Sequence, residues 1–125
     1  MIAGIGIDIV QIKRMDPWLE NNKLLEKYFH PDEIAYAFKG YKTASQSLAA
    51  RFAAKEAFGK AMGTGLKNMA LKDIVVKNSE DGKPEIILTD TAKKAFEESG
   101  ARKIFLSLSH EKEYAAAMVV LESPV

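Results

Sequence analysis

Residues 43–62 constrain the fold of this chain more than any other stretch. They are rich in alanine. Alanine is the strongest helix former, and Gly63-Thr64-Gly65 follows at once, so the pattern predicts a long helix that ends near Met62. The many small side chains of this helix let neighbouring elements approach closely. We therefore expect the strands to pack against it.

The opening segment, residues 2–10, alternates between two kinds of side chain, which predicts a β-strand. Ile5, Ile7 and Ile9 share one face, and we expect this isoleucine row to lie in the core. The other face is bare, because two glycines precede Asp8 on it. Glycine in a strand often marks a close approach by another backbone or by a ligand.

Further helices and strands follow from caps, turns and alternation. Asp16-Pro17 and His30-Pro31 each predict a helix start, and Asp81-Gly82-Lys83-Pro84 predicts a hairpin turn. The remaining elements are strands at 72–77 and 85–89, a helix at 91–99, and strands at 104–109 and 114–121. The chain therefore reads as a single α+β domain over residues 1–125, with antiparallel strands packed against the long helix.

Composition excludes several classes of function. The net charge of +1 provides no global field for nucleic acid or an acidic membrane, so we expect neither as a partner. There is no cysteine, which rules out disulfides, thiolate zinc sites and thiol nucleophiles. No stretch reaches the roughly 20 apolar residues of a membrane span, and no signal peptide is apparent, so we expect a cytoplasmic protein.

Asp8 and Glu56 are the candidate metal ligands. Aspartate is disfavoured in strands, so Asp8 indicates a function, although a solvent-facing aspartate that deters strand pairing is an equal explanation. Glu56 stands one helical turn before Lys60, which a surface ion pair worth about 0.3–0.5 kcal/mol also explains. Together the two carboxylates suggest a Mg²⁺ site for a phosphate-bearing ligand, with Arg51 as a further cation.

Other familiar motifs are absent. Gly4-Ile5-Gly6 lacks the third glycine of a dinucleotide fingerprint, and no Walker A loop is present. Ser109 and His110 bring a hydroxyl and an imidazole to a strand end, a usual place for a site, but no Ser-His-Asp nucleophilic order is evident.

Three blocks together closely resemble the holo-[acyl-carrier-protein] synthase family, the small 4′-phosphopantetheinyl transferases. They are GIGIDIV at 4–10, RFAAKEAFGKAMGTG at 51–65 and SLSHEKEYAAAMVV at 107–120. The resemblance implies transfer of 4′-phosphopantetheine from coenzyme A to a serine of apo-acyl carrier protein, with release of adenosine 3′,5′-bisphosphate, in support of fatty acid biosynthesis. It also implies a homotrimer with coenzyme A bound between subunits.

The resemblance further implies roles for individual residues. Asp8 and Glu56 match the metal ligands for Mg²⁺, and Glu56 and Lys60 are the catalytic pair. Residues assigned to coenzyme A are Arg51, Lys60, Gly63, Gly65, Ser109 and His110.

Docking of the acidic carrier protein requires a basic face, for which Lys13 and Arg14 are the candidates. A solvated loop explains this pair equally well. The stretch at 11–14 departs from the family's commoner acidic-basic pattern, and His30 stands where threonine is common.

Two rival functions remain: a non-catalytic module that binds a nucleotide or carrier protein, and a different Mg²⁺-dependent nucleotide hydrolase.

Overall fold

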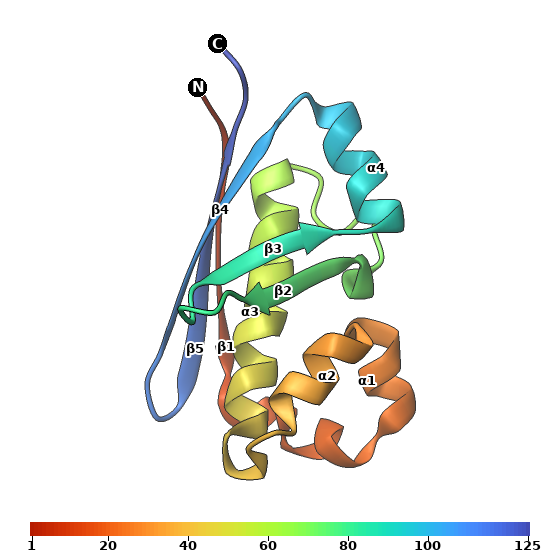
Figure 1. The fold of residues 1–125 in the computed structure, drawn as a ribbon, viewed down its shortest axis with the longest axis vertical. Coiled ribbons are helices and arrows are strands. Elements are labelled where there is room, and N and C mark those ends of the chain that lie inside the picture. Colours follow the sequence, from red (N-terminus) through yellow and green to blue (C-terminus); the bar gives the residue numbers. More distant parts are fainter.

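The computed structural model describes residues 1–125 as two antiparallel sheets and four α-helices (Figure 1). The larger sheet has the strand order β1-β5-β4, and a separate hairpin pairs β2 with β3. None of the helices is both long and apolar enough to cross a bilayer. The strands are β1 (Ile2–Gln11), β2 (Ile74–Asn78), β3 (Pro84–Leu88), β4 (Lys103–His110) and β5 (Tyr114–Glu122). The α-helices are α1 (Asn22–Tyr28), α2 (Pro31–Ala37), α3 (Ala44–Met62) and α4 (Asp90–Ser99).

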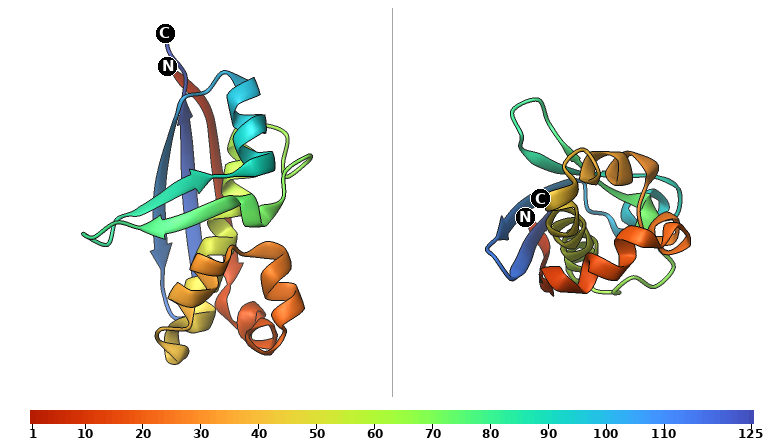
Figure 2. Two further views of the ribbon diagram at one scale, coloured as in Figure 1. Left: turned by 45° about the vertical axis from the view of Figure 1, so that its right-hand side comes forward. Right: turned by 90° about the horizontal axis from the view of Figure 1, so that it is seen from below.

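Helix α3 confirms the long alanine-rich helix and forms the centre of the molecule. It lies along one face of the sheet, while the hairpin and the other helices cover its remaining sides (Figures 1 and 2). The turn between β2 and β3 projects beyond the rest of the chain (Figure 2). Gly63 ends α3 in the left-handed conformation, with φ of 79°, as the sequence predicted.

Two glycines on β1 bring the strand and α3 into backbone contact. A Cβ atom added to Gly4 would overlap the carbonyl oxygen of Ala61, and one added to Gly6 would overlap that of Ala57. The close approach that the glycines predicted is therefore made by the helix backbone. It sets the distance between β1 and α3 and leaves no room for side chains between them.

The predicted burial of the isoleucine row is wrong for the chain taken alone. Ile5, Ile7 and Ile9 are 59%, 60% and 64% exposed, on the sheet face that points away from α3. The physical reason is the glycine face, because only the side of β1 without side chains can accept the helix so closely. The isoleucines consequently lie on the outer face.

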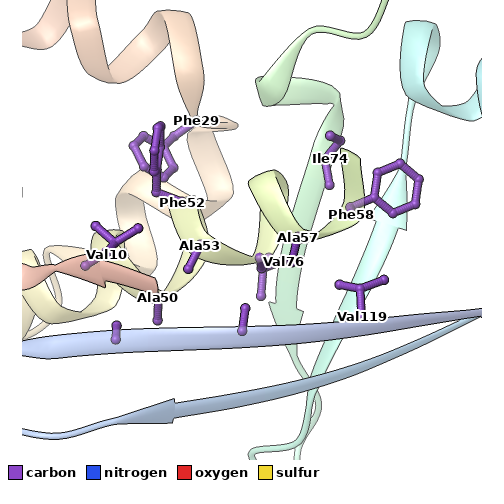
Figure 3. Close-up of a cluster of buried hydrophobic side chains, with 14 of the residues drawn as sticks. Val10, Phe29, Ala50, Phe52, Ala53, Ala57, Phe58, Ile74, Val76 and Val119 are labelled. Atoms are coloured by element: carbon purple, nitrogen blue, oxygen red, sulfur yellow. The ribbon is translucent and has the colours of Figure 1, made fainter. Parts of the chain in front are cut away.

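The hydrophobic core lies on both sides of α3. Phe29, Phe52 and Val10 meet near its first half, and Phe58 packs towards Ile74 near its second half (Figure 3). Small alanines on α3 face β5, where the side chains are also small or branched. The short side chains explain how a sheet and a helix pack without bulky residues between them.

The first helical segment differs from its prediction. Residues Ile12–Glu20 form the 3₁₀ segment η1, and α1 begins only at Asn22. Asn21 caps α1, because its side-chain oxygen accepts a hydrogen bond from the Leu24 amide at 3.1 Å. Asp16 does not cap a helix and instead accepts a hydrogen bond from Ser45 Oγ at 2.6 Å. Two further short 3₁₀ segments are η2 (Tyr41–Thr43) and η3 (Leu71–Asp73).

The other predicted elements are confirmed with small changes in their ends. His30 and Glu33 form a capping box at the start of α2, and Gly100 ends α4 with φ of 87°. The hairpin is present, although Lys72 belongs to η3 rather than to its first strand.

The glycine contact gives a stability prediction. We expect Gly6→Ala to lower the free energy of unfolding by at least about 2 kcal/mol, because the new methyl group would push α3 away from β1. Urea denaturation measures this change. Gly40→Ala is the matched control, since Gly40 has an ordinary φ of −125° and its Cβ would approach only the hydroxyl of Thr43. Equal stabilities of the two variants would contradict the role given to Gly6.

Candidate functional site

Asp8 lies on the inner face of β1, two residues after Gly6, and so points towards α3. Its carboxylate oxygen Oδ1 accepts a hydrogen bond from Lys60 Nζ at 3.0 Å, and the same ammonium donates to the carbonyl of Ile7 at 3.0 Å. The Asp8 side chain is only 18% exposed, whereas that of Lys60 is 55% exposed. The strand therefore holds a half-buried carboxylate whose cationic partner reaches solvent.

Glu56 comes to the same place from α3, one turn before Lys60. Burial raises the pKa of the Glu56 carboxyl, and the charge of Asp8 raises it further, while Lys60 and Arg14 oppose the shift. The two carboxylates are thus close enough to repel each other. The structure brings Asp8, Glu56 and Lys60 together within one chain.

Arg14 lies beside this cluster, a position that the sequence did not suggest. Its guanidinium lies over the Phe52 ring, 5.2 Å from the ring centroid, and Phe52 is one helical turn before Glu56. The available signal was the Phe52–Glu56 spacing, which places an aromatic face next to the carboxylate. Lys13 and Arg14 were named together as candidates for docking the carrier protein. Lys13 lines a separate polar pocket of about 560 Å³ between η1 and the β4–β5 turn.

The donor set of the cluster fits Mg²⁺. That ion takes one or two carboxylates and completes its shell with waters and phosphate oxygens. Asp8 and Glu56 provide two carboxylates, and no group of three potential His, Cys, Asp or Glu ligands is present anywhere in the chain. A divalent cation between the two would also offset the repulsion between Asp8 and Glu56, which adds to the effect of burial in raising the pKa of Glu56. The residues could therefore hold Mg²⁺ together with a phosphate group.

Arg51 lies on a different side of α3. Its guanidinium donates to Ser47 Oγ at 2.9 Å and to Asn78 Oδ1 at 2.7 Å, and lies over the Tyr36 ring at 4.4 Å. Burial lowers the pKa of Arg51, and its Nε has no hydrogen-bond partner. Within one chain, Arg51 is not part of the Asp8–Glu56–Lys60 cluster.

Ser109 and His110 lie at the end of β4, also away from the cluster. His110 Nε2 is 3.2 Å from Gln46 Nε2, near the beginning of α3. Gln46 and Glu56 are ten residues apart on this helix, which is about 15 Å along its axis. Ser109 is exposed on the outer face of the sheet and pairs with Ala116, which also pairs with Ile9.

Gly63 and Gly65 lie in the loop after α3, just beyond Lys60. Both have positive φ, of 79° and 62°, and the Gly65 amide donates to the carbonyl of Gly59 at 3.0 Å. The loop thus folds back onto the last turn of α3. These glycines lie at the same end of the helix as Lys60, whereas His110 lies at the other.

Known proteins are similar to this chain in sequence and in fold. The sequence profile described as the 4′-phosphopantetheinyl transferase superfamily matches residues 4–119. A holo-[acyl-carrier-protein] synthase from Treponema denticola is 52% identical over 122 residues, which cover 98% of this chain and 99% of that protein. One from Geotalea daltonii is 47% identical over 98% of this chain and 99% of its own.

Solved structures give the same result. A holo-[acyl-carrier-protein] synthase from Neisseria meningitidis superposes with a TM-score of 0.88 at 36% identity, covering 98% of this chain and 100% of that chain. One from Bacillus anthracis, crystallised in complex with CoA (3′,5′-ADP), has a TM-score of 0.80 at 39% identity and covers 99% of each chain. The chain therefore belongs to the 4′-phosphopantetheinyl transferase superfamily and, within it, to the holo-[acyl-carrier-protein] synthases.

Proposed function

We propose that this chain transfers 4′-phosphopantetheine from coenzyme A to a serine of apo-acyl carrier protein, in a Mg²⁺-dependent reaction. The observation that carries the proposal is the meeting of Asp8, Glu56 and Lys60 in a chain of this family. The related Bacillus anthracis structure was obtained with CoA (3′,5′-ADP), which fits coenzyme A as the substrate.

The reaction exchanges a phosphoanhydride bond of coenzyme A for a phosphate ester bond to serine. The serine oxygen bonds to the phosphorus that carries pantetheine, and the bridging P–O bond of the pyrophosphate breaks, so that adenosine 3′,5′-bisphosphate leaves with the electron pair. Asp8 and Glu56 would hold Mg²⁺, which when bound would supply positive charge at the pyrophosphate. Catalysis of this kind depends mainly on positioning and electrostatic stabilisation.

Lys60 and Glu56 have distinct tasks in this scheme. The Lys60 ammonium, fixed by Asp8 and the carbonyl of Ile7, places a positive charge beside the pyrophosphate. Glu56 would supply a ligand for the metal and is also placed to accept the serine proton. Arg14, next to Glu56, adds a cation that can meet either the pyrophosphate or the acidic carrier protein.

A homotrimer with active sites between subunits is the second part of the proposal. The outer face of the sheet exposes a continuous apolar surface, formed by Ile5, Ile7 and Ile9 of β1, Met118 of β5 and Phe105 of β4. A face of this kind on a small protein indicates an interaction surface.

The split of the predicted coenzyme A residues also supports assembly. Ser109 shares the outer sheet face with Ile9, and Arg51 and His110 lie away from Asp8 in the same chain. A site between two chains would bring these separate groups to one ligand. A cytoplasmic location and a role in fatty acid biosynthesis complete the proposal.

The carboxylates can be tested directly by transfer to the carrier protein. We expect Asp8→Asn and Glu56→Gln each to lower the rate by about 100-fold or more, because each removes a carboxylate needed to hold the cation at the pyrophosphate. The measurement is the mass of apo-acyl carrier protein after incubation with coenzyme A and MgCl₂. Glu97→Gln, an exposed change on α4, is the control and should keep the full rate. A wild-type protein that adds no phosphopantetheine with any divalent ion would instead support a binding module.

Removal of divalent metal gives an independent test. We expect EDTA to stop transfer and MgCl₂ to restore it. We also expect MgCl₂ to raise the thermal unfolding midpoint of the wild type, because a ligand that binds only the folded state stabilises it. This midpoint should not rise in the Asp8→Asn variant. An equal rise in both proteins would show that Mg²⁺ binds elsewhere.

The assembly can be tested on the exposed isoleucine row. We expect Ile7→Glu to convert the trimer to monomers, because it places a charge at the centre of the apolar face. Light scattering after size-exclusion chromatography measures the mass. Ile87→Glu is the matched control, since Ile87 is 42% exposed on the hairpin, away from this face. A wild-type protein that is monomeric at all concentrations would contradict the proposal.

A further inference from the structure

Helix α3 is buried on almost every side, so its apolar pattern does not fix its rotation about its own axis. Apolar residues such as Leu48, Ala53 and Phe58 point in different directions and are all fully buried. A helix with one apolar stripe is oriented by that stripe, but a helix that is apolar all round is not. The backbone contacts of Gly4 and Gly6 hold one side of α3 against β1, and an interaction on another side has to complete its orientation, because Glu56 and Lys60 reach Asp8 from only one rotational setting.

Lys55 is a buried cation in this helix, directly before Glu56 in the sequence. Its side chain is completely inaccessible, and the ammonium has three acceptors on other elements. It donates to Glu33 Oε1 of α2 at 2.7 Å, to the carbonyl of Leu71 in η3 at 2.9 Å, and to the carbonyl of Ile74 in β2. Each of the three ammonium hydrogens therefore points to a different element.

Glu33 is the fixed partner of this cation. It is 1% exposed, and its carboxylate accepts the His30 amide at 3.0 Å and the Val76 amide at 3.0 Å, besides Lys55. The first amide is at the N-cap of the helix that carries Glu33, and the second belongs to β2. Glu33 is thus held in place by the fold, and Lys55 is held by Glu33.

Stability alone gives a poor explanation of this pair. Removing two charges from water costs free energy that their attraction often fails to return, and well-packed apolar side chains can do as well. Burial lowers the pKa of Lys55, an effect that the Glu33 carboxylate opposes. Directional polar contacts differ from apolar ones in that they select one arrangement.

The helix geometry connects Lys55 with the reaction. Successive residues are about 100° apart around a helix, so Lys55 faces the hairpin side while Glu56 faces Asp8. Side-chain tips lie about 5–6 Å from the axis, so a rotation of about 10° moves the Glu56 carboxylate by about 1 Å. An error of this size in a catalytic group can cost about 100-fold in rate.

We propose that the buried Glu33–Lys55 pair positions the catalytic residues, by fixing the rotation of α3 so that Glu56 and Lys60 meet Asp8. Neither member of the pair touches the reacting groups, and both act through the helix. The inference rests on the proposed transfer reaction for its kinetic consequence, but its structural consequence can be measured without it.

The double variant Glu33→Gln/Lys55→Met tests this role. It removes both charges together and fills similar volume, and the amide oxygen of the new glutamine keeps an acceptor for one of the two backbone amides, that of His30 or that of Val76. We expect it to unfold cooperatively, with kcat at least tenfold lower and KM for coenzyme A changed less than kcat. Wild-type kcat in the folded double variant would overturn the proposal.

Trp18 provides a second readout that needs no activity. It is the only tryptophan, and its ring packs against Phe52 of α3 with a centroid distance of 5.6 Å. A rotation of α3 therefore changes the near-ultraviolet circular dichroism and fluorescence of Trp18. We expect both signals to change in the double variant. Unchanged Trp18 signals in a folded double variant would overturn the proposal even if the wild type showed no transfer, an outcome that would reject only the proposed function.

Two further variants separate positioning from stability. Ala92→Gly weakens the buried side of α4, and we expect it to lower the unfolding midpoint while kcat and the Trp18 signals stay at wild-type values. Glu33→Asp keeps both charges and shortens the link, so it tests geometry if the double variant does not fold. We expect it to fold with kcat at least fivefold lower, and wild-type kcat in it would overturn the proposal.

Discussion

The direct contact between the backbones of β1 and α3 is the constraint on which the rest of the structure depends. Gly4 and Gly6 remove the side chains that would separate the two elements. Asp8 follows on the same strand face, and Glu56 directly precedes Ala57, whose carbonyl lies against Gly6. A contact without side chains cannot relax by a change of rotamer. The two carboxylates are therefore held at a separation that the backbones determine.

The same strand serves two surfaces because its side chains alternate. Its inner face carries the glycines and Asp8, and its outer face carries the isoleucines. The proposed binding site begins on the first face and the proposed subunit contact on the second. This division explains why the predicted ligand residues lie in two groups, with Asp8, Glu56 and Lys60 in one place and Ser109 and His110 in another. Formation of the site and assembly of subunits are then coupled through one strand.

Local patterns predicted most of the elements, because caps, glycines and alternation act within a few residues. The sidedness of β1 was mistaken, since hydrophobic burial competes there with a backbone contact that only glycine allows. A shared site for Asp8 and Glu56 was a hypothesis from the residues that the resemblance supported, and the two carboxylates lie close together within a single chain. The hydrogen-bond partners of Arg51 and Lys55 could not be predicted from the sequence. Asn78 and Glu33 come from elements whose placement depends on tertiary packing. No periodicity links residues so far apart along the chain.

Two neighbouring residues of α3 have different roles. Lys55 forms a buried ion pair in the interior, and Glu56 belongs to the proposed active site. A single inserted or deleted residue within this helix would turn every later side chain by about 100° relative to those before it. The Glu56 side chain would then point away from Asp8. Larger residues of α3 would take the positions of the small residues that meet Gly4 and Gly6. A substitution in α3 changes the structure locally, whereas a change in the number of residues within the helix before Lys60 would rotate the catalytic side chains away from Asp8. We therefore expect insertions and deletions to be tolerated in the loops that flank this helix and not within it.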